Sequence, residues 1–127
     1  MTSYLLDTHV LLWALDNYEQ LSQSTQNTIN NPQNTLLISD ASLWEIATKI
    51  KIGKLPLHLQ TLIATIENSD YKMLPITTKH ITTTLTLPLH HNDPFDRLLI
   101  AQATAENITL ISSDKIMDKY DIRAISA

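Results

Sequence analysis

The sequence predicts an α/β fold, a three-layer α/β/α sandwich with a central, mainly parallel sheet. Four short apolar segments suited to buried strands, at 3–7, 35–39, 71–76 and 108–114, alternate with segments of helical periodicity. Such alternation builds a parallel sheet with helices on both faces. The chain has 127 residues, the size of one ordinary domain, so we expect residues 1–127 to form a single domain.

Composition limits the classes of function. The hydrophobic fraction of 43% indicates a globular chain, and the absence of cysteine excludes disulfides, a thiolate nucleophile and zinc–sulfur sites. The net charge of −4 argues mildly against a nucleic-acid partner, unless the acids surround a metal and the lysines lie elsewhere. The apolar stretch 4–15 contains Asp7 and His9 and follows no basic leader. We therefore expect no signal peptide, no membrane span and a cytoplasmic location.

The first half of the chain is expected to hold two strands and three helices. Strand 3–7 leads into a helix over 9–16, and the amide-rich segment 20–35 forms a short exposed helix that ends near Pro32. Strand 35–39 leads into a helix over 40–53, with Ser39 or Asp40 as its N-cap. Gly53, the only glycine, closes that helix where a left-handed residue is wanted.

The second half continues the alternation, with Pro56 near the first turn of its first helix. The expected elements are a helix over 55–69, strand 71–76, a short helix over 77–87, a helix over 93–107, strand 108–114, a helical turn over 115–120 and an edge strand over 122–126.

Two aspartates follow strands at the rim of the sheet. Asp7 closes strand 3–7, and Asp114 closes strand 108–114. Parallel strands end at one rim, and ligands bind outside that rim. An aspartate after a strand also caps the next helix or turn, so either residue alone has two equally good explanations.

Glu45 lies between Trp44 and Ile46 in a helix with few other charges. An exposed ion pair with Lys49, four residues on, is the structural explanation. The functional explanation places the carboxylate at the rim of the sheet, beside the aspartates that end the strands.

Asp93 and Asp96 surround the start of the helix over 93–107. Asp93 precedes Pro94 and is expected to be the N-cap, because proline favours the first helical position. One good cap leaves Asp96 without an obvious structural role. Arg97 is expected either beside an acidic cluster or on a phosphate, or else as an exposed helix charge.

Acids on four separate segments can thus meet at one rim. Carboxylates in close proximity raise one another's pKa, and a divalent cation relieves that cost. Oxygen ligands suit Mg²⁺ or Mn²⁺, and such a site supports nuclease or phosphatase chemistry. The four acids are Asp7, Glu45, Asp96 and Asp114.

Four segments, in order, resemble the PIN-domain ribonucleases and, more closely, the VapC-type toxins of prokaryotic toxin–antitoxin pairs. They are LLDTHVLLWAL, SLWEIATKIKIGKL, HNDPFDRLLIAQA and LISSD, and the resemblance runs from Tyr4 to about Ile125. The third segment is the most specific. The resemblance implies an α/β/α sandwich, Mg²⁺- or Mn²⁺-dependent endoribonuclease activity, homodimerisation, and a small antitoxin that covers the acidic rim with a basic side chain.

Residue by residue, the resemblance assigns the metal-binding and catalytic acids to Asp7, Glu45, Asp96 and Asp114. Ser112 stands where the family often has threonine, two residues before the last acid. The resemblance gives His91 the task of fixing its motif rather than of binding metal. Residues expected to support the site or contact RNA are Thr8, His91, Ser112, Asp93, Arg97 and Lys49.

The remaining basic and aromatic side chains have simpler expected roles. Lys49, Lys51, Lys54 and Arg97 are expected to guide the RNA backbone and so offset the net charge. Trp13 and Trp44 are expected in the core or at an interface. The histidines expected to be structural are His9, His58, His80 and His90.

Three other functions remain open. A phosphohydrolase with an aspartyl nucleophile usually has a second aspartate two residues after the first, where this chain has His9. A phosphate-receiving regulatory domain needs an aspartate on a central strand, and strands 35–39 and 71–76, taken as central, have none. A PIN scaffold that acts only by binding a partner is disfavoured by the presence of all four acids.

Overall fold

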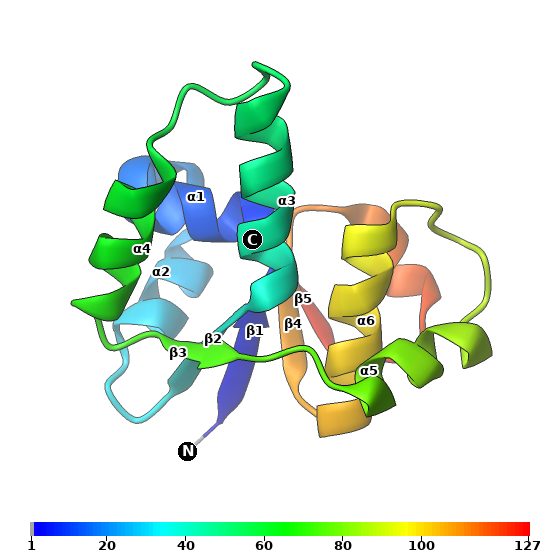
Figure 1. Cartoon of the computed structure of the whole chain (residues 1–127). Helices are drawn as coiled ribbons and strands as arrows, with labels where there is room; N and C mark the ends of the chain where they lie inside the picture. The colour runs from blue at the N-terminus through cyan, green and yellow to red at the C-terminus, as the bar shows by residue number, and fades with distance from the viewer. Residues whose placement is uncertain (1) are drawn as a thin grey trace.

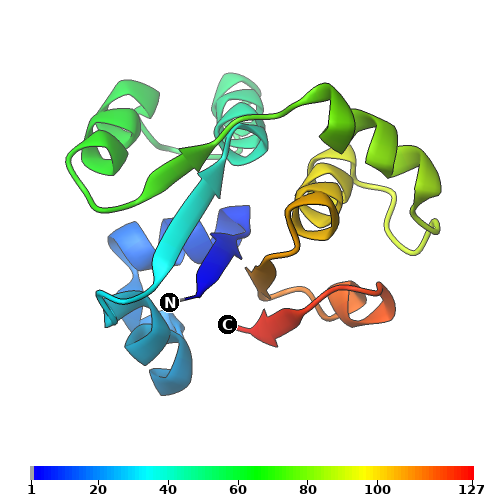
Figure 2. The same ribbon diagram turned by 90° about the horizontal axis from the view of Figure 1, so that it is seen from below.

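A computed structural model describes residues 2–127 and contains a five-stranded sheet in which every strand pairing is parallel (Figures 1 and 2). The predicted α/β fold is therefore confirmed, and the sheet has the order β3-β2-β1-β4-β5. Its strands are β1 (Ser3–Leu6), β2 (Thr35–Ser39), β3 (Lys72–Leu74), β4 (Thr109–Ser112) and β5 (Ala124–Ser126).

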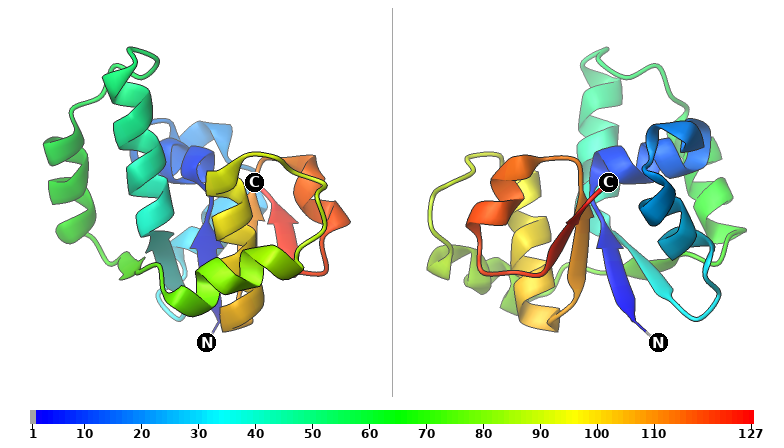
Figure 3. Two further views of the ribbon diagram at one scale, coloured as in Figure 1. Left: turned by 45° about the vertical axis from the view of Figure 1, so that its right-hand side comes forward. Right: turned by 180° about the vertical axis from the view of Figure 1, so that it is seen from behind.

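Helices fill the connections between the strands (Figure 3). The α-helices are α1 (Thr8–Asp16), α2 (Gln23–Asn30), α3 (Asp40–Lys51), α4 (Leu59–Glu67), α5 (Thr78–Thr83) and α6 (Pro94–Glu106). Single turns of 3₁₀-helix occur at η1 (Tyr18–Gln20), η2 (Thr84–Thr86) and η3 (Lys115–Lys119). No helix in the described part of the chain is both long and apolar enough to cross a membrane.

Each face of the sheet has its own core, because successive strand residues point to opposite sides. Leu6 and Ile111 belong to one fully buried cluster, together with residues of α1, α3 and α4. Leu5 and Leu110, their neighbours in β1 and β4, belong to a second cluster with residues of α6 and η3. The sheet is therefore the middle of three layers, and the aliphatic residues of the inner strands β1 and β4 are buried on both faces.

The ends of α3 and α6 follow the chemistry of their sequences. Ser39 caps α3 by accepting a hydrogen bond from the Ala41 N–H, which decides between the two residues predicted for that role. Gly53 has a φ of 76°, the left-handed conformation predicted for the residue after α3. Asn107 ends α6 with a φ of 54°, a conformation that asparagine tolerates better than most residues.

Two expectations about the middle of the chain are wrong. The helix predicted over 55–69 begins only at Leu59, so Pro56 lies outside its first turn. Residues 55–58 instead form an irregular connection that leads from the end of α3 to α4, with Leu55 packed on the first core cluster. The strand predicted over 71–76 shortens to Lys72–Leu74 and lies at one edge of the sheet.

The position of that edge strand also corrects the argument against a phosphate-receiving domain. The central strand is β1, which is followed directly by Asp7, and not the segment 71–76. The lack of aspartate in β2 and β3 therefore excludes nothing, and the assignment of function depends on the site itself.

Candidate functional site

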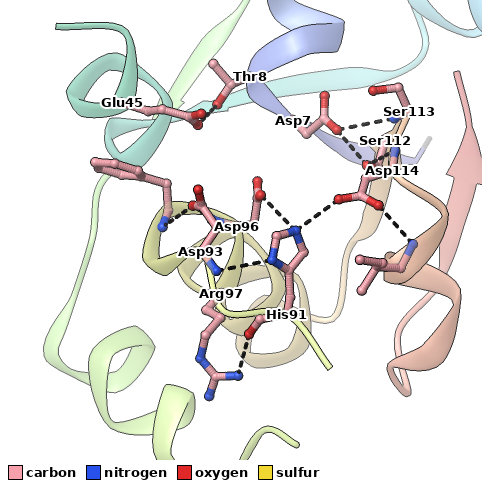
Figure 4. Close-up of polar contacts among 12 residues, drawn as sticks. Asp7, Thr8, Glu45, His91, Asp93, Asp96, Arg97, Ser112, Ser113 and Asp114 are labelled. Carbon is pink, nitrogen blue, oxygen red and sulfur yellow. Dashed lines mark hydrogen bonds and ion pairs between the residues drawn. The ribbon is translucent and has the colours of Figure 1, made fainter. Parts of the chain in front are cut away.

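The acidic site lies where the direction of chain progression across the sheet reverses. From β1 the chain moves to β2 and β3 on one side, and β4 and β5 pair on the other side. A crevice forms at such a switch point outside the carboxyl ends of the strands. Asp7 follows β1 and Asp114 follows β4, so both carboxylates lie beside this crevice (Figure 4).

Asp7 caps a helix and also forms part of the site. Its side chain is 5% exposed, and Oδ1 accepts a hydrogen bond of 2.8 Å from the Val10 N–H at the start of α1. Its Oδ2 accepts from the Ser112 hydroxyl at 2.6 Å and from the Ser113 N–H at 3.3 Å. Burial raises the pKa of Asp7, and these hydrogen bonds oppose that rise.

Ser112 connects two of the predicted acids. Its hydroxyl donates to Asp7 and accepts a hydrogen bond of 3.0 Å from the Asp114 N–H. Asp114 in turn accepts from the Ile116 N–H at the start of η3. A hydroxyl at this position therefore fixes the ends of β1 and β4 relative to each other.

Glu45 is buried, which contradicts a plain surface ion pair. Its side chain extends from α3 toward α1 and is 6% exposed as a residue. The Thr8 hydroxyl donates to Oε1 at 2.6 Å, and Lys49 Nζ lies 2.7 Å from Oε2. The hydrogen bond to Glu45 raises the pKa of Lys49. Thr8 and Lys49 therefore both support a carboxylate held at the mouth of the crevice.

The two aspartates at the start of α6 have different environments. Asp93 Oδ1 accepts from the Phe95 and Asp96 N–H groups at 2.9 and 3.1 Å, as an N-cap does. Asp96 makes no such contact to the helix, and its carboxylate faces the crevice (Figure 4). Burial, followed by the charge of Asp93, raises the pKa of Asp96 to about 7.

His91, which the sequence singled out as a motif-fixing residue, lies between two acids, a contact that the sequence did not specify. Its Nε2 is 3.0 Å from Asp96 Oδ2 and 2.9 Å from Asp114 Oδ2. Its Nδ1 accepts from the Asp93 N–H at 3.2 Å, which leaves the ring proton on Nε2 to point at the carboxylates. The available signal was its position two residues before the N-cap, which brings the ring back to the first turn of α6.

Arg97 makes structural contacts with the segment that leads to α6. Its guanidinium donates to the backbone carbonyls of Thr84, Leu87, Pro88 and His91, at distances from 2.7 to 3.4 Å. These carbonyls belong to η2 and to the irregular segment that leads to α6. Arg97 thus fixes the segment that carries His91, and both terminal amino groups of its guanidinium are engaged.

The four acids line one pocket of about 190 Å³ together with Thr8, Lys49 and Asp93, whereas Ser112 and Arg97 are not among its lining residues. The donor set fits a hard divalent cation, because the acids offer oxygen ligands. The ion-pair contacts of the acids at the pocket, in the described structure, are those with Lys49 and with the imidazole of His91. One nitrogen of His91 and one oxygen each of Asp96 and Asp114 lie within 4.8 Å of one another. The pocket is lined by Asp7, Thr8, His9, Glu45, Lys49, His91, Asp93, Asp96, Ser113 and Asp114.

The other histidines lie outside this cluster, apart from His9 at its margin. His80 is buried and joins α5 to α6 through Glu106 Oε2 at 2.9 Å. His58 contacts the Thr61 hydroxyl, and the ring of His90 packs edge-on against Tyr120.

The two tryptophans differ in exposure. Trp13 is partly buried against the first core cluster, in agreement with the sequence prediction. Trp44 is 59% exposed and packs edge-on against Phe95. Trp44 is therefore a surface residue and forms no part of the core.

Fold and site together define a parallel α/β protein with an acidic centre at its switch point. The chain belongs to the PIN domain family, whose model matches residues 4–123. PIN domains are nucleases that use a divalent metal, so a nuclease is the class that fold and family support. No curated protein sequence matches the chain significantly.

Solved structures of VapBC complexes have the same fold. A chain in the structure of VapBC2 from Rickettsia felis bound to a DNA fragment from their promoter has a TM-score of 0.74, with 20% identity and 99% of both chains covered. DNA-bound VapBC from Salmonella typhimurium gives 0.71, with 16% identity over 99% of this chain and 98% of that one. VapBC-5 from Mycobacterium tuberculosis gives 0.62 at 16% identity, over 99% and 98%. The fold of this chain is that of VapC-type PIN proteins.

Proposed function

We propose that this protein is a Mg²⁺- or Mn²⁺-dependent endoribonuclease and the toxin of a toxin–antitoxin pair. The observation that carries the proposal is the convergence of Asp7, Glu45, Asp96 and Asp114 on one pocket at the switch point of a PIN fold. Structural explanations account for Asp7 as a cap and for Glu45 as an ion-pair partner. They leave the carboxylate of Asp96 close to other acids, with the His91 imidazole as its described partner, and a bound cation would relieve the remaining repulsion.

Asp7, Asp96 and Asp114 are the residues that would hold the cation. When bound there, the cation would neutralise charge on a phosphodiester and make water easier to deprotonate. Glu45 orients and deprotonates the attacking water, or helps to hold a second ion. Lys49 contacts the Glu45 carboxylate at 2.7 Å, and Thr8 fixes the direction of that carboxylate by a hydrogen bond.

A small antitoxin is the proposed protein partner. The support is the fold shared with chains of VapBC complexes, together with the resemblance of the four sequence segments. A basic side chain of the antitoxin entering the acidic pocket would satisfy the same carboxylates as a cation and so inhibit the enzyme. A homodimer and a cytoplasmic location, where RNA is accessible, belong to the same proposal.

The direct experiment compares cleavage of total RNA by the purified protein in Mg²⁺, in Mn²⁺ and in EDTA. We expect discrete fragments with either metal and none in EDTA. The phosphohydrolase alternative predicts release of inorganic phosphate from a small phosphomonoester, and a binding-only scaffold predicts neither activity. Mapping the fragment ends identifies the RNA that is cut.

The toxin role is tested separately in cells. Induction of the chain should arrest growth, and co-expression of a small protein encoded beside it should restore growth. Growth that continues at full rate during induction of soluble protein would refute the toxin role but leave nuclease activity to the assay in vitro.

A further inference from the structure

A second pocket adjoins the acidic pocket and has a different chemical character. It has a volume of about 250 Å³ and is lined by Thr8, His9, Leu12, Lys49, Lys54 and Leu55. The two pockets share Thr8, His9 and Lys49, so one leads into the other. Acids surround the first pocket, whereas the second combines two ammonium groups with the apolar walls of Leu12 and Leu55.

The end of α3 places both lysines on the wall of this second pocket. The Lys54 N–H donates to the Lys49 carbonyl at 2.9 Å, and the Gly53 N–H donates to the Ile50 carbonyl at 3.1 Å. This pair of bonds is the Schellman motif, which requires the left-handed φ of 76° at Gly53. The turn reverses the chain so that Lys54 returns to the level of Lys49. The single glycine of the chain thus brings two positive charges together beside the acidic pocket.

The basic residues of this acidic protein are unevenly distributed. Three of its nine lysines and arginines, Lys49, Lys51 and Lys54, lie within six consecutive positions. Both arginines are engaged, Arg97 with the carbonyls described above and Arg123 with Asn107. Lys49 is paired with Glu45, and in the described structure no ion pair involves Lys54. Lys54 is exposed and free to meet an anion.

We propose that this second pocket binds the nucleotide next to the scissile phosphate, with Lys54 on its phosphate. The proposal rests on the function proposed above and gives the RNA strand a direction, from the acidic pocket toward the end of α3. Single-stranded RNA is held by cations on the backbone and by apolar or aromatic surfaces against bases and riboses, which are the two features of this pocket.

His9 occupies the junction of the two pockets and positions the strand. Its ring is exposed and lies tilted by 33° over Trp13, with 5.9 Å between ring centroids. A base that leaves the acidic pocket meets this ring first, and histidine rings stack on unpaired bases. His9 therefore acts on the orientation of the substrate and takes no part in the reaction.

The large apolar groove on the other side of the site is a poorer route for the strand. It has a volume of about 570 Å³ and includes Trp44, Ile76, Ile81 and Leu98. Arg97, the one cationic residue that lines this groove, donates its hydrogen bonds to backbone carbonyls. A phosphate in that groove would be desolvated without a partner, which is costly.

The experiment measures binding of a fluorescein-labelled single-stranded oligoribonucleotide in the presence of Ca²⁺. The salt concentration is varied between about 50 and 200 mM, the range over which affinity that depends on phosphate contacts falls steeply. For Lys54→Ala we expect the dissociation constant to rise about fivefold at low salt, and the slope of log affinity against log salt to shrink by about 0.7. Lys54→Arg should restore both. Lys72→Ala, which removes an exposed charge on the edge strand β3, is the matched control and should leave both unchanged.

His9→Ala should weaken binding without changing the salt slope, because a stacked ring neutralises no phosphate. RNA cleavage by wild type in Mn²⁺ is measured in parallel, so that failure of the proposed nuclease function can be distinguished from failure of the proposed nucleotide pocket. If RNA binding depends on Lys54 but wild type cleaves no RNA, the proposed nuclease activity is refuted and the pocket remains an RNA-binding site. The pocket assignment would be overturned if wild type cleaves RNA while Lys54→Ala equals Lys72→Ala in affinity and salt slope. The absence of RNA binding by wild type would also overturn it.

Discussion

Asp93 and Asp96 lie in the first turn of the same helix, and Asp93 satisfies the backbone of Asp96. The Asp93 carboxylate accepts the N–H groups of Phe95 and Asp96, and Asp96 makes no contact with the helix backbone through its own carboxylate. The side chain of Asp96 instead lies 3.0 Å from His91 Nε2. One aspartate thus starts the helix, and the other is available to the site.

Asp93→Ala should destabilise the protein, and Asp93→Asn should not. Loss of an N-cap side chain costs about 1 kcal/mol, and asparagine caps as well as aspartate. Urea denaturation of both variants and wild type measures the free energy of unfolding. The asparagine variant also removes the charge that raises the pKa of Asp96, so that pKa should fall in ¹³C NMR titration. Equal stability of the alanine variant and wild type would contradict the capping role.

The stability of the metal-free protein should fall as pH rises toward 7. The pKa of Asp96 is about 7 in the folded protein, against 3.8 for the free side chain. Between these two pH values the folded state binds more protons than the unfolded state. The contribution of Asp96 to the free energy of unfolding is therefore fully present below about pH 4 and is lost as the pH rises through 7. Urea denaturation in EDTA at a series of pH values measures this slope.

Asp96→Asn is the control for that pH dependence, since the variant has no carboxyl to titrate. Its slope in EDTA should be shallower than that of wild type. Saturating Mn²⁺ should also reduce the wild-type slope, because a bound cation replaces the proton. If the stability of Asp96→Asn depends on pH as steeply as that of wild type, the pH dependence comes from other groups.

Arg97→Ala should destabilise the protein by about 2 kcal/mol, because four carbonyls lose a charged donor. Arg97→Lys should recover little of this, since an ammonium lacks the planar fork of donors. Hydrogen exchange of residues 84–91 should accelerate in both variants. Arg123→Ala is the comparison variant, because the exposed hydrogen bonds that it removes all go to Asn107. Unchanged exchange in the segment would refute the fixing role.

Ser112→Ala should weaken metal binding, whereas Ser112→Thr should preserve it. The serine hydroxyl is the hydrogen bond that most strongly opposes the rise in the pKa of Asp7. Its loss raises that pKa further and loosens Asp114, so the Mn²⁺ dissociation constant should rise about tenfold, as for lost outer-shell partners of metal sites. Isothermal titration calorimetry at neutral pH measures the constant. Equal affinity of the alanine variant and wild type would contradict this role for the hydroxyl.

The elements of the fold were predictable where local chemistry and tertiary structure agree. Alternating apolar strands and helices predicted the parallel sheet, and Ser39, Gly53 and Asp93 marked helix ends correctly. The prediction failed at Pro56, where residues 55–58 form an irregular connection between α3 and α4 rather than the first turn of a helix. The order of strands is a tertiary property, so the edge position of β3 could not be inferred from its composition.

The convergence of the four acids on one pocket agrees with the prediction, because strand ends and helix starts can be located in a sequence. The partners of Arg97 are backbone carbonyls, which carry no sequence signal. His91 belongs to an irregular segment, so its contact with Asp114, 23 residues away, depends on packing. Contacts of these two kinds could be identified only from the structure.

The most direct test of the proposed site is the rate of cleavage of one defined single-stranded RNA in Mn²⁺ by Asp96→Asn and wild type. Asp96 caps no helix, and the variant has nearly the same shape, so circular dichroism should show an unchanged fold. The proposed site predicts a rate at least about 100-fold lower than that of wild type. Equal rates in two folded samples would contradict the central claim that this acidic pocket is the catalytic centre.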